Sequence, residues 1–155
     1  MVTNTVRPEM VVVGRPVGKA VAVQRAERLS VLVVDCQLLC AHALRRLLTG
    51  EDPNLDVQVA GDIERAWDLI KTDRVECVIC NIHDHHGAAI EMMRRAEAAG
   101  IATRFMLIGL VGEEAALFDG FNAGAAAAFR ADARFEDFWV GFLNVLAGHR
   151  SLDDR

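Results

Sequence analysis

From residue 29 onward, apolar and polar residues follow two alternating patterns. Short apolar runs, typical of strands buried on both faces of a parallel sheet, alternate with segments that carry an apolar residue at every third or fourth position, the period of a helix. The apolar runs predict strands at residues 29–35, 55–60, 75–81, 105–109 and 125–129. The helical segments predict helices at residues 38–49, 63–71, 88–99, 113–122 and 134–147.

Capping and stop residues support these boundaries. Asp62 stands where its side chain can cap a helix that begins at residue 63. Gly50, Gly100 and Gly148 follow the last apolar positions of three helices, and glycine commonly ends a helix. Because strand and helix alternate five times, we expect one α/β domain, a doubly wound sheet of five parallel strands with helices on both faces.

Residues 1–28 do not share this pattern. They contain two of the three prolines, Pro8 and Pro16, and two valine-rich stretches, at residues 11–13 and 17–23, that could pair as a hairpin or lie extended. We therefore divide the chain into an N-terminal extension at residues 1–28, flexible or used to dock a partner, and a folded domain at residues 29–153.

Length and composition fit one globular domain. The chain has 155 residues, a formal net charge of −5, 52% hydrophobic residues and 25% charged residues, which excludes disorder for its bulk. The acidic balance argues against direct binding to nucleic acid, and no apolar run reaches the roughly 20 residues of a membrane-spanning helix. The first nine residues lack the pattern of a secretory signal, so we expect a cytoplasmic protein with no membrane association.

Cys77 and Cys80 form a C-x-x-C pair, which in other settings indicates a redox or zinc site. Here the pair falls inside an apolar run, and residues three apart in a strand point to opposite faces of the sheet. A cytoplasmic chain also keeps its thiols reduced. We therefore expect these two thiols to be buried and to serve only in packing.

Three of the predicted strands close on Asp35, Asn81 and Gly109. In sheets of this type, ligands bind outside the carboxyl ends of the strands, near the point where the strand order reverses. The sequence therefore predicts the functional site at this edge of the sheet.

Several short motifs, in order along the chain, resemble the receiver domain of response regulators. They are Ser30-Val-Leu-Val-Val-Asp35 with Cys36-Gln-Leu-Leu39, Gly61-Asp62 with Ala66, Ala123-Gly-Ala125 with Asp132-Ala133, and the closing stretch from Val145 to Asp153. The closing stretch resembles the end of receivers that precede a LuxR-type helix-turn-helix. The resemblance covers residues 29–153 and implies a flavodoxin-like sheet of order 2-1-3-4-5 and a role in two-component and transcriptional signalling.

The family transfers a phosphoryl group from a histidine kinase to an aspartate at the end of strand three, so the resemblance also implies positions for five functional residues. Asp35 falls on the first of two magnesium-binding acids, Cys36 on the second, Asn81 on the acceptor, Gly109 on the Thr/Ser position, and Ala131, with Arg130 beside it, on the Lys position. An acyl phosphate forms by attack of a carboxylate on phosphorus, and an amide is not such a nucleophile. One carboxylate beside a thiol is also a poor magnesium site.

These substitutions favour a pseudo-receiver: a receiver domain that is not phosphorylated, is not an enzyme, needs no cofactor and acts by binding a protein, such as a regulator, a kinase or a second copy. The last predicted helix supplies a candidate interface, because its apolar stripe contains Phe135, Phe138, Trp139 and Phe142. Periodicity alone places such a stripe in the core. Receivers often dimerise or dock partners through this helix, so the resemblance implies an interface and a homodimer.

A second interpretation makes the same pocket a ligand, metal or redox sensor. The loop after Asn81 carries His83, Asp84, His85 and His86 on the rim of the predicted pocket, and Cys36 with Asp35 should lie across from it. Imidazole, carboxylate and thiolate groups together can bind zinc or copper. The alternative is that a short surface loop carries solvated histidines.

Overall fold

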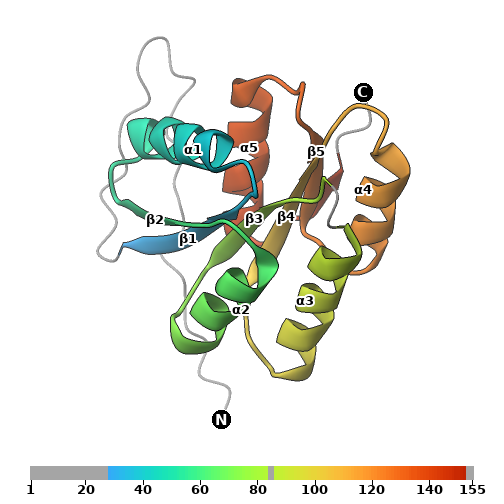
Figure 1. Cartoon of the computed structure of the whole chain (residues 1–155). Coiled ribbons are helices and arrows are strands. Elements are labelled where there is room, and N and C mark those ends of the chain that lie inside the picture. The colour runs from blue at the N-terminus through green and yellow to red at the C-terminus, as the bar shows by residue number, and fades with distance from the viewer. Residues whose placement is uncertain (1–27, 84–85, 153–155) are drawn as a thin grey trace.

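Six parallel strands form one sheet in the order β2-β1-β3-β4-β5-β6 (Figure 1). The computed structural model describes residues 28–83 and 86–152, so the expected extension at residues 1–28 lies, except for Arg28, outside the described residues. The strands are β1 (Leu29–Val34), β2 (Leu55–Ala60), β3 (Cys77–Asn81), β4 (Arg104–Gly109), β5 (Ala127–Arg130) and β6 (Ser151–Leu152). The predicted order 2-1-3-4-5 is confirmed, and β6 is an addition at the β5 edge that the sequence pattern did not predict.

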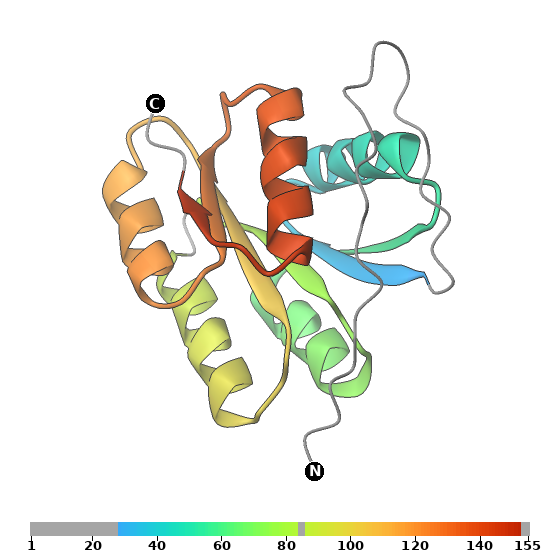
Figure 2. The same ribbon diagram turned by 180° about the vertical axis from the view of Figure 1, so that it is seen from behind.

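Five helices connect the strands and lie on both faces of the sheet. They are α1 (Leu38–Glu51), α2 (Ile63–Thr72), α3 (His86–Ala98), α4 (Glu114–Asn122) and α5 (Phe135–Leu146). α1 and α5 cover one face, whereas α2, α3 and α4 cover the other (Figures 1 and 2). Among the described residues, no helix is both long and apolar enough to cross a membrane.

The helix ends agree with the sequence signals at several points. Asp62 caps α2, because its Oδ1 accepts a hydrogen bond from the backbone N of Arg65 over 2.7 Å. Gly100 and Gly148 follow α3 and α5 with φ angles of 68° and 93°, the left-handed region that glycine adopts at little cost. Two helix boundaries differ by two residues. α1 continues through Gly50 to Glu51, so Gly50 does not end it, and α3 begins at His86 rather than at residue 88.

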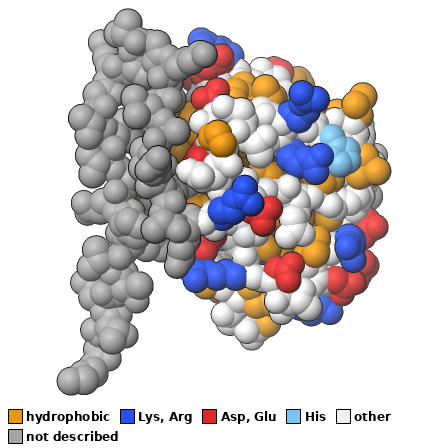
Figure 3. Space-filling view, turned by 90° about the vertical axis from the view of Figure 1, so that its left-hand side faces the viewer, with side chains coloured by type: hydrophobic (Ala, Val, Ile, Leu, Met, Phe, Trp, Pro, Cys, Tyr) orange, Lys and Arg blue, Asp and Glu red, His pale blue; other side chains and the backbone are white. Residues whose placement is uncertain are grey.

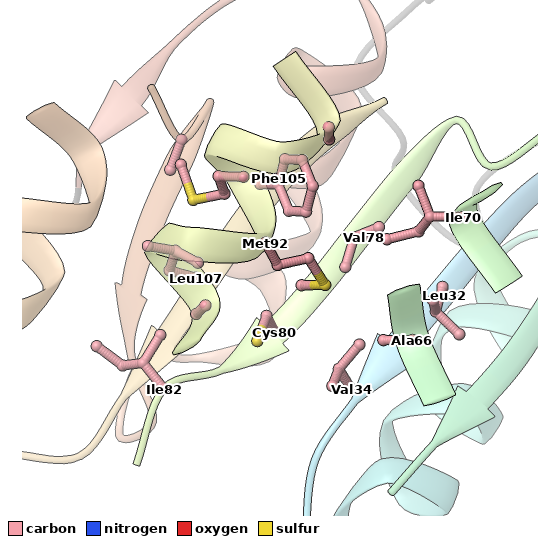
Figure 4. Close-up of a cluster of buried hydrophobic side chains, with 14 of the residues drawn as sticks. Leu32, Val34, Ala66, Ile70, Val78, Cys80, Ile82, Met92, Phe105 and Leu107 are labelled. Carbon is pink, nitrogen blue, oxygen red and sulfur yellow. The ribbon is translucent and has the colours of Figure 1, made fainter. Parts of the chain in front are cut away.

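The alternation of side chains along the strands divides the core into two apolar layers. Figure 4 shows the layer between the sheet and the helices α2, α3 and α4, where strand residues such as Leu32, Val78 and Leu107 pack against Met92 of α3 and Ile70 of α2. The second layer lies under α1 and α5. Its buried members include Val31, Val33, Cys77, Ile79, Met106, Leu48, Phe138, Phe142 and Val145.

The C-x-x-C pair is split between these two layers, as predicted. Cys77 belongs to the layer under α1 and α5, and Cys80 belongs to the opposite layer. Burial raises the pKa of each thiol to about 12, because a thiolate would lose its hydration. Cys36 and Cys40 are exposed, and all four cysteines are free.

A glycine sets how closely α5 approaches the sheet. A Cβ atom added at Gly141 would lie 2.3 Å from Cζ of Phe129 in β5, so a side chain there would force the ring or the helix to move. The Phe129 ring therefore fits directly beneath the helix backbone. This contact fixes which side of α5 faces β5.

Candidate functional site

Asp35 follows β1 at the carboxyl edge of the sheet and is 8% exposed, the only polar or charged residue classed as buried in the described part of the chain. Its two carboxylate oxygens have different partners. Oδ1 accepts a hydrogen bond from the backbone N of Gln37 over 2.8 Å, and Oδ2 accepts one from Nδ2 of Asn81 over 3.1 Å. The carboxylate is thus held by two N–H donors, which compensates for its burial.

Asn81, the last residue of β3, uses both ends of its side-chain amide. Its Nδ2 group donates to Asp35, and its Oδ1 atom accepts a hydrogen bond from the backbone N of His83 over 3.0 Å. The amide therefore bridges the end of β1 and the turn that follows β3. The structure brings Asp35 and Asn81 into direct contact, whereas Cys36 next to Asp35 is exposed.

Gly109 ends β4, and the space beside it is filled from α4. A Cβ atom added at Gly109 would lie 2.9 Å from Cγ of Leu117, closer than real Cβ contacts allow. Leu117 is itself buried. The carbonyl of Gly109 accepts a hydrogen bond from the backbone N of Ala131 over 2.7 Å, so Ala131 is linked to this edge through its main chain.

Arg130 ends β5, and its guanidinium group pairs with two acidic side chains. Its Nε atom donates to Oδ1 of Asp132 over 2.9 Å, Nη2 contacts the other oxygen of that carboxylate, and Nη1 lies 3.7 Å from Oε1 of Glu114 at the start of α4. The hydrogen bond from Arg130 lowers the pKa of Asp132. Arg130 therefore joins α4 to the turn after β5.

His83 and Glu113 connect two loops at the same edge. Nδ1 of His83 lies 2.8 Å from Oε1 of Glu113, and Oε2 of Glu113 accepts a hydrogen bond from the backbone N of Leu110 over 2.7 Å. Both hydrogen bonds lower the pKa of the Glu113 carboxyl, and the bond with His83 has the larger effect. The sequence analysis missed Glu113 as a site residue. Its position three residues after Leu110 suits a turn, but its pairing with His83 depends on how the two loops meet.

In the described part of the chain, the candidate metal ligands do not come together. His83 is paired with Glu113, and His86 is exposed at the start of α3. Asp84 and His85 lie outside the described residues. Across residues 28–83 and 86–152, no three His, Cys, Asp or Glu side chains come together in a way that could hold a metal ion.

The four aromatic residues of α5 fall into two classes. Phe138 and Phe142 are buried, with Phe142 fully enclosed, whereas Phe135 and Trp139 are only partly buried. The rings form one connected stack, with centroids 6.4 Å apart for Phe135 and Trp139 and 5.3 Å apart for Trp139 and Phe142. Part of this aromatic surface is thus available to another molecule.

The comparison with known proteins is informative at the level of structure. No family model matches the chain, and no curated protein is significantly similar to it in sequence. Many solved structures do match. A LuxR family DNA-binding response regulator from Silicibacter pomeroyi is 20% identical, with a TM-score of 0.69 over 82% of this chain and 98% of that one.

Two further matches show the same domain. A CheY-like response regulator receiver domain protein from Methanospirillum hungatei is 14% identical, with a TM-score of 0.65 over 77% of this chain and 94% of that one. A response regulator from Burkholderia pseudomallei, solved with a phosphorylated aspartic acid, calcium ion and citrate, is 15% identical, with a TM-score of 0.60 over 77% of this chain and 69% of that one. The chain therefore has the receiver-domain fold of two-component response regulators.

Proposed function

We propose that this chain is a pseudo-receiver, a receiver-fold module of two-component and transcriptional signalling that accepts no phosphoryl group and acts by binding a protein partner. It would do so in the cytoplasm, without a cofactor and without catalysis of its own. The receiver fold supports the signalling context. The chemistry of the carboxyl edge supports the loss of phosphorylation.

The hydrogen bond between Asn81 and Asp35 carries this proposal. Phosphoryl transfer to the end of β3 needs a carboxylate nucleophile, and Asn81 has an amide there whose Nδ2 group donates to Oδ2 of Asp35. The same bond engages Asp35, a buried carboxylate that could have bound magnesium. Since Cys36 adds a thiol where a second carboxylate would be needed, the donor set fits magnesium poorly.

The packing around Gly109 supports the same conclusion. Receivers read the phosphoryl group with a hydroxyl at this position, and Gly109 has no side chain. Because Leu117 lies within 2.9 Å of where a Cβ atom would be, a hydroxyl-bearing residue could be accommodated only if Leu117 moved. The edge of the sheet is therefore packed for a glycine.

A protein is the partner that best fits the surface. On the face drawn in Figure 3, Lys and Arg side chains are interspersed with Asp and Glu rather than gathered into the basic stripe that binds nucleic acid. The partly exposed rings of Phe135 and Trp139 are residues of the kind that dominate protein interfaces. The partner is a second copy of the chain, which gives a homodimer, or another regulator or kinase.

Phosphorylation can be tested directly. The purified chain is incubated with acetyl phosphate and magnesium, and its intact mass is measured before and after hydroxylamine treatment. We expect no gain of a phosphoryl group. A hydroxylamine-labile gain on the wild-type chain would overturn the proposal.

A matched pair of variants tests the physical reason. Asn81→Asp restores the nucleophile alone and should gain little, because Cys36, Gly109 and Ala131 remain. A variant that combines Asn81→Asp with Cys36→Asp, Gly109→Thr, Leu117→Ala and Ala131→Lys should gain far more. Efficient labelling of Asn81→Asp alone would show that the remaining substitutions do not matter.

A further inference from the structure

An apolar strip runs along the layer formed by α1 and α5. On α5 it comprises Phe135, Trp139 and Leu143, which are only partly buried. On α1 it comprises Leu44, which packs against the same layer, and Leu47, which lies one turn further along and is 49% exposed. We call these five residues the α1/α5 strip.

The two sides of the strip face one another. Gly141 lies against Phe129 of β5, so that side of α5 points away from α1. At 3.6 residues per turn, Trp139 and Leu143 stand roughly 200° around the helix from Gly141 and therefore point toward α1. The backbones of α2 and α3, and those of α3 and α4, approach each other closely, whereas the backbones of α1 and α5 lie further apart. The layer with the strip is thus the less completely covered one.

The chain itself enters at one end of the strip. Leu29, the first residue of β1, packs in the same apolar layer. α5 also ends at this edge of the sheet. Its last residue is Leu146, and the carbonyl of Leu146 accepts a hydrogen bond over 2.9 Å from Nη1 of Arg104, the first residue of β4. The described part of the chain therefore begins at this end of the strip.

The length and chemistry of residues 1–27 suit the strip. From Phe135 to Leu146 the helix rises about 17 Å, and the seven residues 17–23 span about 23 Å when extended. Residues 24–28 suffice as a connection. In an extended conformation Val17, Val21 and Val23 share one side with Lys19, whose charge sits at the end of a long flexible stem. Residues 1–27 also contain four Lys or Arg against two Asp or Glu, whereas the chain as a whole carries −5, so the segment is attracted to the domain.

We propose that residues 17–23 lie extended along the α1/α5 strip of their own chain, with Val17, Val21 and Val23 against Trp139 and Leu143. This docking does not depend on the loss of phosphorylation proposed above, and it competes with a partner for the surface of Trp139. The test uses the isolated full-length protein, so its failure leaves the tests of phosphorylation untouched.

Trp139 reports on the docking. The chain has two tryptophans, and Trp67 lies in the opposite apolar layer. In a Trp67→Phe background, Val21→Asp should shift the Trp139 emission to longer wavelength and raise its quenching by acrylamide. The matched control, Ala20→Asp, adds the same charge one residue away on the other side of the segment and should change neither. In a Trp139→Phe background, Trp67 is the only tryptophan, and neither substitution should change its emission or its quenching.

The results show whether residues 17–23 or another molecule covers the α1/α5 strip. Shielding of Trp139 that is unchanged by Val21→Asp, or equally lost in Ala20→Asp, would overturn the proposal. Shielding that depends on protein concentration would assign the strip to a second copy and would also overturn it. If Trp67→Phe fails to fold, the indole N–H resonances of the otherwise wild-type protein give the same readout, because Val21→Asp should move only one of the two.

Discussion

Single side chains decide the chemistry at the carboxyl edge. Asn81 donates a hydrogen bond to Asp35, and Leu117 occupies the space beside Gly109. Restoration of a reactive site would therefore require coordinated changes on β3, β4 and α4 rather than one substitution.

Gly109→Thr should lower the free energy of unfolding by about 1–3 kcal/mol, because the added side chain overpacks against Leu117. Denaturant unfolding measures the loss. Gly50→Ala, in α1 with nothing within 4 Å of an added Cβ, is the control and should be neutral or stabilising. The combination of Gly109→Thr with Leu117→Ala should lose less than the sum of the two single variants. Strict additivity would show that the two side chains do not compete for space.

Glu113→Gln should reduce the loss of folding stability that accompanies a fall in pH. His83 and the Leu110 N–H hold the pKa of Glu113 below its ordinary value of 4.5. A carboxyl with a lowered pKa in the folded state contributes stability above its unfolded pKa and loses it as the pH falls through the folded pKa. The wild type should therefore lose more stability than Glu113→Gln as the pH falls below about 4.5.

Denaturant melts over a pH series measure this difference. Glu91→Gln, which removes one exposed carboxylate from α3, controls for the change in net charge. If the profiles of wild type, Glu113→Gln and Glu91→Gln run parallel below that pH, the contact between His83 and Glu113 has no energetic role.

At the scale of whole elements, α5 combines two tasks. One side of the helix closes the core through Phe138, Phe142 and Val145, and an adjacent side leaves Phe135 and Trp139 partly exposed. The close contact of Gly141 with Phe129 fixes this rotation. The periodicity of the sequence predicts the stripe but not its rotation, because the rotation depends on a contact with a different strand.

The two classes of ring should respond differently to truncation. Phe142→Ala should cost about 3–5 kcal/mol of stability, because it opens a cavity in the core. Trp139→Ala should cost less stability, but it should weaken association by about 2 kcal/mol or more if the ring is an interface anchor. Thermal melts and sedimentation at equal folded concentration measure the two quantities.

Val140→Ala is the control on the same helix, since Val140 is 56% exposed and lies away from the stripe. It should change neither property. If every aromatic variant loses stability and none changes association, α5 serves only as core and the interface lies elsewhere.

The thiols of β3 should be inert in the folded protein. Cys77 and Cys80 are buried on opposite sides of the sheet with pKa values of about 12, whereas Cys36 and Cys40 are exposed. A thiol-specific reagent should therefore modify Cys36 and Cys40 under native conditions and all four cysteines in denaturant. Cys36→Ser with Cys40→Ser should abolish the native reaction. A Cys77–Cys80 disulfide formed under mild oxidation would contradict this strand geometry.

For the molecule as a whole, the absence of a hydroxyl at Gly109 predicts a single conformation. Addition of beryllofluoride and magnesium, which mimic a bound phosphoryl group, should leave the amide spectrum of the protein unchanged. Chemical-shift changes across α4 would show that the carboxyl edge of the sheet still binds the mimic and that binding changes the conformation of α4. A protein without this response would be controlled by the concentration of its partner or by another ligand.

The strand and helix pattern predicts the architecture because buried strands and amphipathic helices leave long regular signals. β6 escaped prediction because two residues, Ser151 and Leu152, carry no periodicity. The contact of Asp35 with Asn81 follows from adjacent strand ends, whereas that of His83 with Glu113 joins residues 30 positions apart through two irregular loops. Such loop contacts depend on tertiary packing and have no local signature.

The short strand β6 has a consequence for the behaviour of the protein at high concentration. It pairs with Ala127 and Ala128 of β5, and Arg150 anchors it by donating to the carbonyls of Phe121 and Ala125. An unpaired apolar strand edge is a template for aggregation. A version of the chain that ends before Ser151 would bare the edge of β5 and should precipitate more readily, so expression and crystallisation should retain these last residues.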